Sequence, residues 1–421
     1  MNILILGSGG REHALAWKIK QSAYCDKLFV APGNAGTAHI AENVSMDVND
    51  FEKQRQFCKE NNIELVVVGP EDPLVKGVYD FFKEDENILV IGPSKEGAQL
   101  EGSKSFSKKF MQRHNIPTAA YAEFDAASFE QGKQYILQQT LPVVLKADGL
   151  AAGKGVVIAA THEQALQAFE GMIIHKQFGD ASAKVVIEQF LDGIEASVFV
   201  LTDGNDYKII GHAKDYKRIG EGDTGLNTGG MGCVTPVPFV EGEFMQKVEE
   251  RIIKPTVNGL YSEQIVYKGF IFFGLINIQG EPFVIEYNAR MGDPETEVVL
   301  PGLKNDLVEL FLAVGNGTLK DCNVSIDKRA IATIVAVSGG YPGDYEKGKT
   351  VRLPQHTGDS IIFHAGTRVE GDHVVTNGGR VLAVTSSGNS IQQAVAQSKE
   401  ILEQVSFEGM YYRQDIGYEF E

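Results

Sequence analysis

Short apolar segments alternate with helical patterns over the first hundred residues, and this alternation constrains the fold more than any other feature of the chain. Each apolar segment is followed by glycine, with or without a neighbouring proline; the segments are 3–6, 28–31, 65–68 and 89–91. Helical periodicity fills the intervals at 11–21, 51–61 and 74–83, with Asn49 and Glu52 as the expected capping box of the second helix. Buried strands that alternate with helices predict an α/β unit built on a doubly wound parallel sheet.

Glycine-rich and polar loops follow these predicted strands, at 7–13, 32–36 and 69–73. Ligands of such sheets bind outside the carboxyl ends of the strands, so these loops are a predicted binding rim. The first loop is similar to a dinucleotide fingerprint, but Glu12 replaces its third glycine and no acidic residue ends the second strand. The loop is therefore better suited to a small phosphate monoester, bound by backbone N–H groups and Arg11, than to a nicotinamide cofactor.

The pattern changes near residue 102, where Ser103 is a candidate N-cap of a new helix. A strand–helix–strand–strand–helix–strand unit is predicted from 117 to 191, with Thr161 capping its second helix. Further strands are predicted at 196–201, 207–212, 270–278 and 282–287, and a helix at 243–260. The last 95 or so residues read as a small α+β domain, with β segments at 331–337, 361–364 and 380–384 and a helix at 391–404.

Charge and cysteine content exclude several classes of function. The 39 Lys and Arg against 56 Asp and Glu give a net charge of −17, which disfavours nucleic-acid and anionic-membrane partners. The four cysteines (Cys25, Cys58, Cys233 and Cys322) are not spaced as a metal knuckle or redox pair. The first residues lack the basic region of a signal peptide, and no apolar segment approaches the ~20 residues of a membrane span. We therefore expect a cytoplasmic protein with reduced thiols.

The segment GLAAGKG, residues 149–155, is a candidate phosphate-binding loop. It is not a P-loop, because Gly155 follows Lys154 where Ser or Thr is needed, and because strands are predicted on both sides, at 143–147 and 156–160. A glycine hairpin with a central lysine can still fold over a polyphosphate, and Lys146 would add a second charge. The alternative is a flexible hairpin with a solvated lysine.

Alternation along the predicted strand 283–290 places Glu286, Asn288 and Arg290 on one face. Ile285, Tyr287 and Ala289 then share the opposite face. A carboxylate and an amide oxygen at this spacing can hold Mg²⁺, and the arginine can bind a carboxylate or a transferring phosphoryl group. The alternative is a strand with one solvated face; three more acidic residues between 291 and 297 argue against it, because crowded carboxylates favour a cation.

The charged, glycine-rich segment 213–232 contains little apolar material. Segments of this length without secondary structure are usually functional or disordered. Predicted strands on both sides favour an anchored, functional loop.

Several of these segments together resemble a known superfamily. Lys146, the hairpin at 153–155, EQFLDGIE at 188–195 and Glu286-x-Asn288 resemble the ATP-grasp ligases. Within that superfamily, RMGDPETE at 290–297 is similar to the phosphoribosylamine–glycine ligases, also called glycinamide ribonucleotide synthetases. The loops at 7–13, 31–36, 69–73 and 212–218 resemble the same family, so the resemblance spans the chain.

The resemblance implies a fold in four units. These are a Rossmann-like parallel sheet at 1–101, an ATP-grasp core at 102–116 and 192–326, an inserted lid at 117–191, and an α+β domain at 327–421. It also implies an ATP-dependent ligase of de novo purine biosynthesis, which joins glycine to 5-phosphoribosylamine through glycyl phosphate. The implied cofactor is Mg²⁺ or Mn²⁺, the implied partners are these small molecules with ATP, and we expect a monomer.

The resemblance also implies roles for individual residues, as follows. ATP phosphates would be bound by Lys104, Lys146, Gly153, Lys154 and Gly155, and the adenosine by Glu188, Gln189, Phe190, Leu191 and Glu195. Catalysis would rest on Lys146, Arg290 and Asp293, the last two also orienting glycine, and the metal on Glu286 and Asn288. The phosphoribosylamine would be held by Gly10, Asn34, Glu71, Asp215 and Asn227.

One feature departs from the wider superfamily, whose members often carry an acidic metal ligand on the preceding strand. Residues 268–279 contain none, which leaves Asp293 and Glu295 as candidates for a second metal ligand. Two other functions stay open: a different ATP-dependent carboxylate–amine ligase, and a nucleotide-binding protein without catalysis. The joint presence of Lys146, Glu286, Asn288 and Arg290 argues against the second.

Overall fold

The structure is a computed structural model that describes residues 1–151 and 155–420. Its N-terminal unit is the predicted parallel sheet, in the order β5-β4-β1-β2-β3. Its strands are β1 (Asn2–Gly7), β2 (Lys27–Pro32), β3 (Glu42–Asn43), β4 (Ile63–Val68) and β5 (Leu89–Pro93). Its helices are α1 (Gly10–Ile19), α2 (Phe51–Glu60), α3 (Glu71–Lys76) and α4 (Val78–Phe82). The adjacency of β4, β1 and β2 brings the three predicted rim loops together.

Two local predictions in this unit are wrong. The helix expected at 74–83 is divided into α3 and α4 at Gly77, whose φ of +94° is a left-handed conformation that ends a helix. The N-cap of α2 is Asp50, which accepts a hydrogen bond from the Lys53 amide at 3.1 Å. Asn49 lies one residue before the cap, and its side chain contacts Asp72, to which its Nδ2 donates at 2.8 Å.

A mixed core follows the N-terminal sheet and continues it. Its strands are β10 (Ile194–Thr202), β11 (Tyr207–Asp215), β15 (Tyr267–Ile278) and β16 (Glu281–Asn288). Its helices are α5 (Gln99–Gly102), α6 (Lys104–Arg113), α9 (Gly242–Val248) and α10 (Lys254–Ser262), the last two joined by a helical turn at Glu249–Ile253. Ser103 caps α6 as predicted, because its hydroxyl accepts from the Phe106 amide at 3.1 Å.

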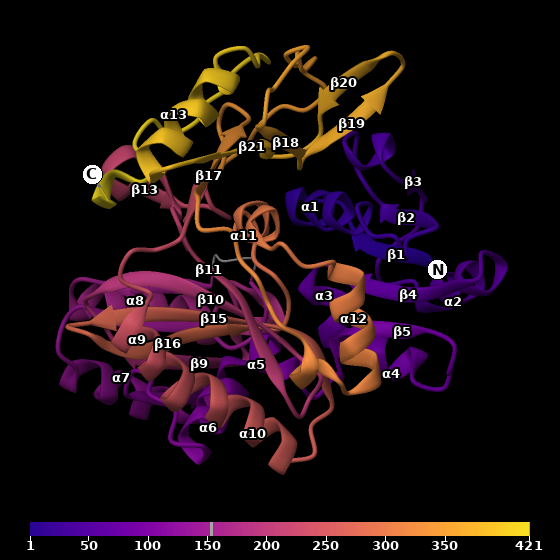
Figure 1. The fold of residues 1–421 in the computed structure, drawn as a ribbon. Helices are drawn as coiled ribbons and strands as arrows, with labels where there is room; N and C mark the ends of the chain where they lie inside the picture. The colour runs from indigo at the N-terminus through magenta and orange to yellow at the C-terminus, as the bar shows by residue number, and fades with distance from the viewer. Residues whose placement is uncertain (152–154, 421) are drawn as a thin grey trace.

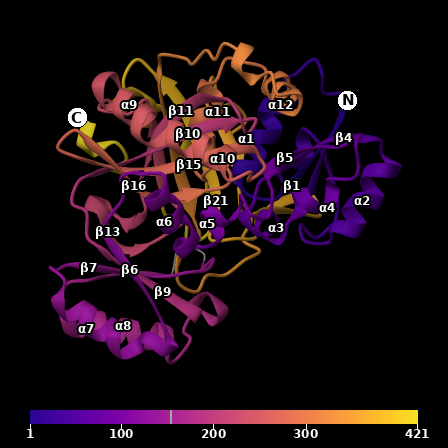
Figure 2. The ribbon, with the colours of Figure 1, turned by 90° about the horizontal axis from the view of Figure 1, so that it is seen from below.

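The segment predicted as a strand–helix–strand–strand–helix–strand unit has that order. It comprises β6 (Tyr121–Asp125), α7 (Phe129–Gln138), β7 (Val143–Ala147), β8 (Val156–Ala159), α8 (His162–Ile173) and β9 (Lys184–Gln189). The strands form a separate antiparallel sheet in the order β6-β9-β7-β8. Figure 2 shows this unit projecting from the main body, with α7 and α8 on its outer side. Thr161 caps α8 by accepting from the Gln164 amide at 3.2 Å, also as predicted.

The C-terminal part is the expected small α+β unit. It comprises β17 (Ala330–Val337), β18 (Ile361–His364), β19 (Thr367–Glu370), β20 (His373–Thr376), β21 (Arg380–Gly388) and α13 (Ile391–Leu402). Before it lie β14 (Gly232–Thr235), α11 (Thr296–Gly302) and α12 (Leu307–Asn316). In Figure 1 this unit caps the molecule above α1 and α11, so it faces both the N-terminal unit and the core.

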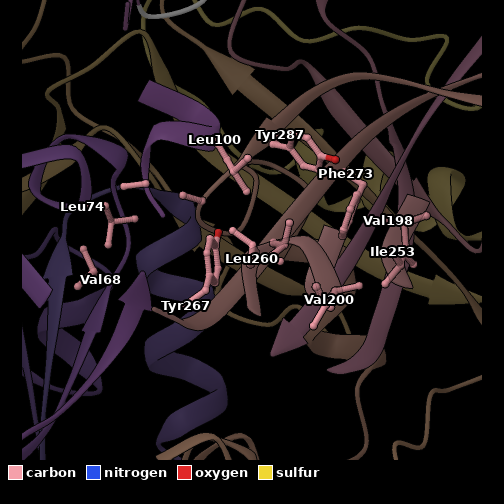
Figure 3. Close-up of a cluster of buried hydrophobic side chains, with 14 of the residues drawn as sticks. Val68, Leu74, Leu100, Val198, Val200, Ile253, Leu260, Tyr267, Phe273 and Tyr287 are labelled. Carbon is pink, nitrogen blue, oxygen red and sulfur yellow. The ribbon is translucent and has the colours of Figure 1, made fainter. Parts of the chain in front are cut away.

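A single long sheet connects the three parts, in the order β18-β21-β17-β14-β11-β10-β15-β5-β4-β1-β2-β3, with β16 also paired to β15. The junction between N-terminal unit and core is apolar. Figure 3 shows Val68 and Leu74 in one buried cluster with Tyr267, Leu260 and Phe273. This shared core holds the rim loops of the parallel sheet at a fixed place relative to β16.

Two exclusions from the sequence can be compared with the structure. Among the described residues, no helix combines the length and apolarity that crossing a lipid bilayer requires. The four cysteines are free thiols, and Cys58 and Cys233 are buried.

A histidine pair joins the N-terminal and C-terminal units. His13 on α1 accepts a hydrogen bond through Nδ1 from the His364 amide on β18, at 2.8 Å. Both imidazoles are buried. Burial lowers the pKa of His13 to about 3, with further lowering by His364 and His39, and lowers that of His364 to about 4. Both side chains are therefore neutral in the folded protein.

We expect these histidines to make the protein acid-sensitive. Their folded pKa values lie below the value of ~6.5 in an unfolded chain, so the unfolded state binds more protons below that pH. The free energy of unfolding should therefore fall as pH drops from 6.5 towards 4, by roughly 2–3 kcal/mol per histidine at pH 4.5. Urea unfolding between pH 7.5 and 4.5 measures this loss. His13→Asn keeps an acceptor for the His364 amide and should reduce the loss, whereas the exposed His373→Asn should not. If the free energy of unfolding fell equally with pH in the wild type and both variants, this explanation would be refuted.

Candidate active site

A β-bulge in β16 directs the predicted metal ligands. Glu286 pairs with Gly274 and Asn288 with Phe272 on β15, and the register shifts between Gly274 and Leu275. Glu286 and Asn288 therefore share one face, as predicted, and both are partly exposed.

Because of the bulge, the prediction that Ile285 shares the opposite face with Tyr287 and Ala289 is wrong. Tyr287 and Ala289 lie in the hydrophobic core, but Ile285, expected beside them, does not. The bulged residue instead presents its carbonyl to Lys146, whose Nζ donates to it at 3.2 Å.

The side chains of Glu286 and Asn288 make no hydrogen bonds to other residues in the described part of the chain. Glu286 influences two nearby lysines, Lys104 and Lys217. The pKa of Lys104 is lowered by burial, against the attraction of Glu286. The pKa of Lys217 is raised well above its usual value because Asp215, Glu195 and Glu286 outweigh its burial. Two free oxygen donors of this kind fit Mg²⁺ or Mn²⁺, which prefer carboxylate and carbonyl oxygens.

Glu188 lies between two buried lysines. Its Oε2 is 2.9 Å from Lys146 Nζ and its Oε1 is 3.2 Å from Lys108 Nζ. Burial raises the pKa of Glu188, but the two lysines outweigh it and the net shift is downward. Burial also lowers the pKa of Lys108 to about 8. The Glu188 side chain thus holds Lys146 against β16, so any contact of residue 188 with adenine would rest on its main chain.

The sequence reasoning missed Lys108. Its signal was its spacing of four residues from Lys104, which places both lysines on one face of α6. Lys104, at the first turn of that helix, donates through Nζ to the Gly149 carbonyl at 3.2 Å. The two lysines therefore join α6 to the base of the predicted phosphate hairpin and to β9.

The hairpin connects β7 and β8 as predicted, and the Gly155 carbonyl accepts from the Ala147 amide at 2.8 Å. Gly153 and Lys154 lie outside the described residues, so their predicted phosphate contacts stay predictions. Gln189, Phe190 and Leu191 follow the Glu188 position at the end of β9. Glu195 is half-exposed at the start of β10 and is paired with Lys217 at 2.8 Å.

Arg290 is fixed by two carboxylates from the N-terminal side of the molecule. Its Nη2 is 2.7 Å from Glu101 Oε1, and its Nε is 3.3 Å from Glu71 Oε2. Glu101 also accepts from the Ala289 amide at 2.7 Å. Burial raises the pKa of Glu101 despite Arg290; the pKa of Glu71 is lowered because Arg290 and Arg11 outweigh its burial. Glu101 was absent from the predicted site.

Residues 291–297, here called the acidic turn, carry Asp293, Glu295 and Glu297. The sequence predicted that a cation would balance these carboxylates, whereas in the structure an arginine pairs with the first and the other two are buried. Asp293 Oδ1 is 2.9 Å from Arg380 Nη2, and Asp293 Oδ2 accepts from the Arg11 amide at 3.2 Å. Burial, with Asp215 nearby, raises the pKa of Glu295 to about 8. Glu297 is buried, neither of its oxygens has a hydrogen-bond partner among the described residues, and burial raises its pKa strongly. Burial therefore disfavours the charged form of both Glu295 and Glu297.

The candidate second metal ligands have little support in this geometry. Asp293 is already engaged by Arg380 and a backbone amide. Within residues 1–151 and 155–420, no group of three or more His, Cys, Asp or Glu side chains is arranged to hold a metal ion.

Asn34 and Gly10, two of the predicted contacts of the phosphoribosylamine, hold neighbouring parts of the rim together. The Asn34 amide donates to the carbonyls of Ser8 and His364, and its oxygen accepts from the Gly36 and Thr37 amides. Gly10 packs so closely on Glu297 that a Cβ would overlap the carboxylate. The geometry therefore favours a role for both residues in shaping the rim.

The loop at 213–232, for which disorder was the alternative, contains regular structure. It contains β12 (Arg218–Gly220) and β13 (Thr224–Asn227), which pair as a short antiparallel ribbon. Asp215 ends β11 beside Glu195 and Lys217, and burial raises its pKa. Asn227 is exposed at the end of β13.

Comparison with protein families finds three matches in succession along the chain. The N, ATP-grasp (A) and C domains of phosphoribosylglycinamide synthetase match residues 1–101, 102–296 and 331–419. The phosphoribosylamine–glycine ligase of Vibrio cholerae is 47% identical over 423 residues, covering 99% of this chain and 98% of the relative. That of Chlorobaculum tepidum is 46% identical over 424 residues, covering 99% of both.

Solved structures show the same likeness. The phosphoribosylamine–glycine ligase of Thermotoga maritima is similar with a TM-score of 0.88 and 36% identity, over 99% of this chain and 100% of that one. The biotin carboxylase domain of Hydrogenobacter thermophilus 2-oxoglutarate carboxylase, solved with MgADP, has a TM-score of 0.72 at 17% identity, over 97% and 91%. The second likeness shows that the overall fold is shared with a protein of low sequence identity.

Proposed function

The chain belongs to the phosphoribosylglycinamide synthetase family, and from this premise we propose that its site joins glycine to 5-phosphoribosylamine while converting ATP to ADP and phosphate. The product would be glycinamide ribonucleotide, in de novo purine biosynthesis. The observation that carries the proposal is the convergence on β16 of three groups. These are the free oxygen pair of Glu286 and Asn288, the lysine that Glu188 fixes, and the carboxylate-held Arg290.

In the first step, a glycine carboxylate oxygen attacks the γ-phosphorus and ADP leaves, giving glycyl phosphate. Phosphoryl transfer depends mainly on positioning and charge neutralisation. Lys104 and Lys146 would bind the triphosphate, and Arg290 would orient the glycine carboxylate, its own direction fixed by Glu71 and Glu101. Glu286 and Asn288 would hold Mg²⁺ or Mn²⁺, which when bound neutralises phosphate charge.

In the second step, the amine of phosphoribosylamine attacks the glycyl carbonyl, phosphate leaves and the amine loses a proton. Asp215, Asn227 and the rim loops around Gly10, Asn34 and Glu71 would hold this substrate, with Asp293 beside them. An acyl phosphate hydrolyses readily, so water must be excluded. The projecting unit at 117–191 would supply that exclusion by closing over ATP.

Isotope transfer tests the acyl-phosphate step. Glycine labelled with ¹⁸O in its carboxylate should transfer one labelled oxygen to each released phosphate, because that oxygen bridges carbon and phosphorus in the intermediate. Mass spectrometry of the phosphate measures the transfer, and labelled water with unlabelled glycine is the control. Phosphate without label from labelled glycine would exclude glycyl phosphate.

Requirements for turnover separate the remaining alternatives. The proposed ligase releases ADP only when glycine and phosphoribosylamine are both present, and a panel of other acids and amines would reveal a different carboxylate–amine ligase. A nucleotide-binding protein without catalysis would bind ATP and release no ADP under any condition. We also propose that the protein is a cytoplasmic monomer, which sedimentation would test. Its proposed units are 1–101, 102–116 with 192–326, 117–191 and 327–421.

A further inference from the structure

One side chain of the C-terminal unit contacts both the acidic turn and the loop before β14. Arg380, the first residue of β21, donates through Nη1 to the Asp293 carbonyl at 2.7 Å and to the Gly229 carbonyl at 2.8 Å. Its Nη2 is 2.9 Å from Asp293 Oδ1, and its side chain is 21% exposed. A single guanidinium thus bridges residues that lie in separate segments of the chain.

The packing around this guanidinium is close enough to define its position. A Cβ at Gly229 would come within 2.9 Å of the Arg380 Cζ, and a Cβ at Gly230, where φ is +123°, would overlap Pro294. Tyr341, also from the C-terminal unit, accepts the Gly229 amide on its hydroxyl at 3.0 Å. The segment 228–232 is therefore pressed against the acidic turn, with Arg380 between them.

Arg380 also sets the direction of the Asp293 carboxylate. One oxygen faces the guanidinium, and the other accepts from the Arg11 amide at the start of α1. Burial would raise the pKa of Asp293, but Arg380 and Arg11 outweigh it, so the carboxylate stays charged. Without Arg380, a charged and nearly buried group would lose its only ion-pair partner within 4 Å among the described residues.

We propose that Arg380 is a positioning residue of the ligase site, which orients Asp293 and fastens the segment 228–232 to it. The C-terminal unit would then contribute directly to the geometry of the reaction. The inference rests on the proposed function, because it assumes that Asp293 faces glycine or the transferred phosphoryl group. Arg380 itself acts through Asp293 and need not touch substrate.

Arg380→Met tests the proposal against Arg329→Met. Arg329 precedes another strand of the same unit, and its only ion-pair partner among the described residues is the nearby Asp327, at 3.0 Å. Because small displacements of catalytic groups are costly, we expect Arg380→Met to lower kcat about 100-fold, with the KM for ATP within about 2-fold. Arg380→Lys keeps the charge facing Asp293 and should recover about 10-fold of the loss. A kcat for Arg380→Met within 2-fold of that for Arg329→Met would overturn the proposal.

A double variant tests whether Arg380 acts through Asp293. If it does, Arg380→Met combined with Asp293→Asn should be no slower than Asp293→Asn alone, because residues acting as a unit are non-additive. Losses that multiply would overturn the proposal. Hydrogen exchange of 228–232 should accelerate in Arg380→Met but not in Arg329→Met, and an unchanged rate would also overturn it. This last readout needs no turnover, so a wild-type protein without ligase activity would refute the proposed function and leave the exchange result to decide on Arg380.

Discussion

Glu286→Gln is expected to lower kcat about 10³-fold, the range measured when one preorganised charge-stabilising group is removed. The substitution keeps the size of the side chain and one oxygen, but it removes the charge that draws a divalent cation to β16. Glu286 has no hydrogen bonds to other described residues and lies outside the hydrophobic core, so the melting temperature should change little. ADP release, measured at increasing Mg²⁺ concentration, should show a higher Mg²⁺ requirement and a lower plateau.

Glu281→Gln is the matched control. It is the same substitution on the same strand, but Glu281 pairs with Lys247 and Arg251 at the surface. Exposed ion pairs contribute little to stability, and Glu281 is not part of the proposed metal site. The kcat of Glu281→Gln should therefore stay near that of the wild type. Near-normal turnover of Glu286→Gln at ordinary Mg²⁺ would remove Glu286 from the metal site. A parallel loss in both variants would point to damage to β16 itself.

The order of strands and helices was predictable because it depends on local patterns. Apolar runs ending in glycine predicted β1, β2, β4 and β5, and the positions of Ser103 and Thr161 predicted two helix starts that the structure has. The failures were equally local. Asn49 and Asp50 are both good N-cap residues; the structure uses Asp50, and Asn49 instead contacts Asp72, which is distant in the sequence.

The partners of the site residues could not be predicted, because they come from remote parts of the chain. Arg380 and the Asp293 carbonyl are separated by 87 residues, and the Ala289 amide lies 188 residues from its acceptor Glu101. No periodicity or motif spacing in the sequence predicts such pairings. The bulge at Ile285 is a similar case, since it follows from how β15 and β16 meet. The residue types of the site, and the shared face of Glu286 and Asn288, were readable from sequence, whereas the partners that hold each side chain were not.

Arg290→Lys is expected to lower kcat/KM for glycine about 10³-fold, although the positive charge is kept. A guanidinium is planar and can pair with two carboxylates at once, whereas an ammonium is a point charge on a flexible stem. In the structure, Arg290 uses this geometry to contact Glu71 and Glu101 on one side and the Met291 carbonyl through Nη1, at 3.3 Å. Lysine cannot hold both carboxylates and still present a fixed donor pair to the carboxylate of glycine.

The loss should be confined to glycine recognition and chemistry. Lys104 and Lys146 are held by the Gly149 carbonyl and by Glu188, which do not contact Arg290, so the dissociation constant of ATP should change by no more than about 2-fold. Arg113→Lys is the control, because Arg113 also forms a two-pronged pair with a glutamate, Glu263, at 2.7 and 2.8 Å, but at the surface. Steady-state kinetics in glycine, with calorimetry for ATP, measure both effects. An Arg290→Lys protein that turned over glycine normally would show that charge alone suffices at this position. The ordered contacts with Glu71 and Glu101 would then serve only to neutralise a partly buried cation.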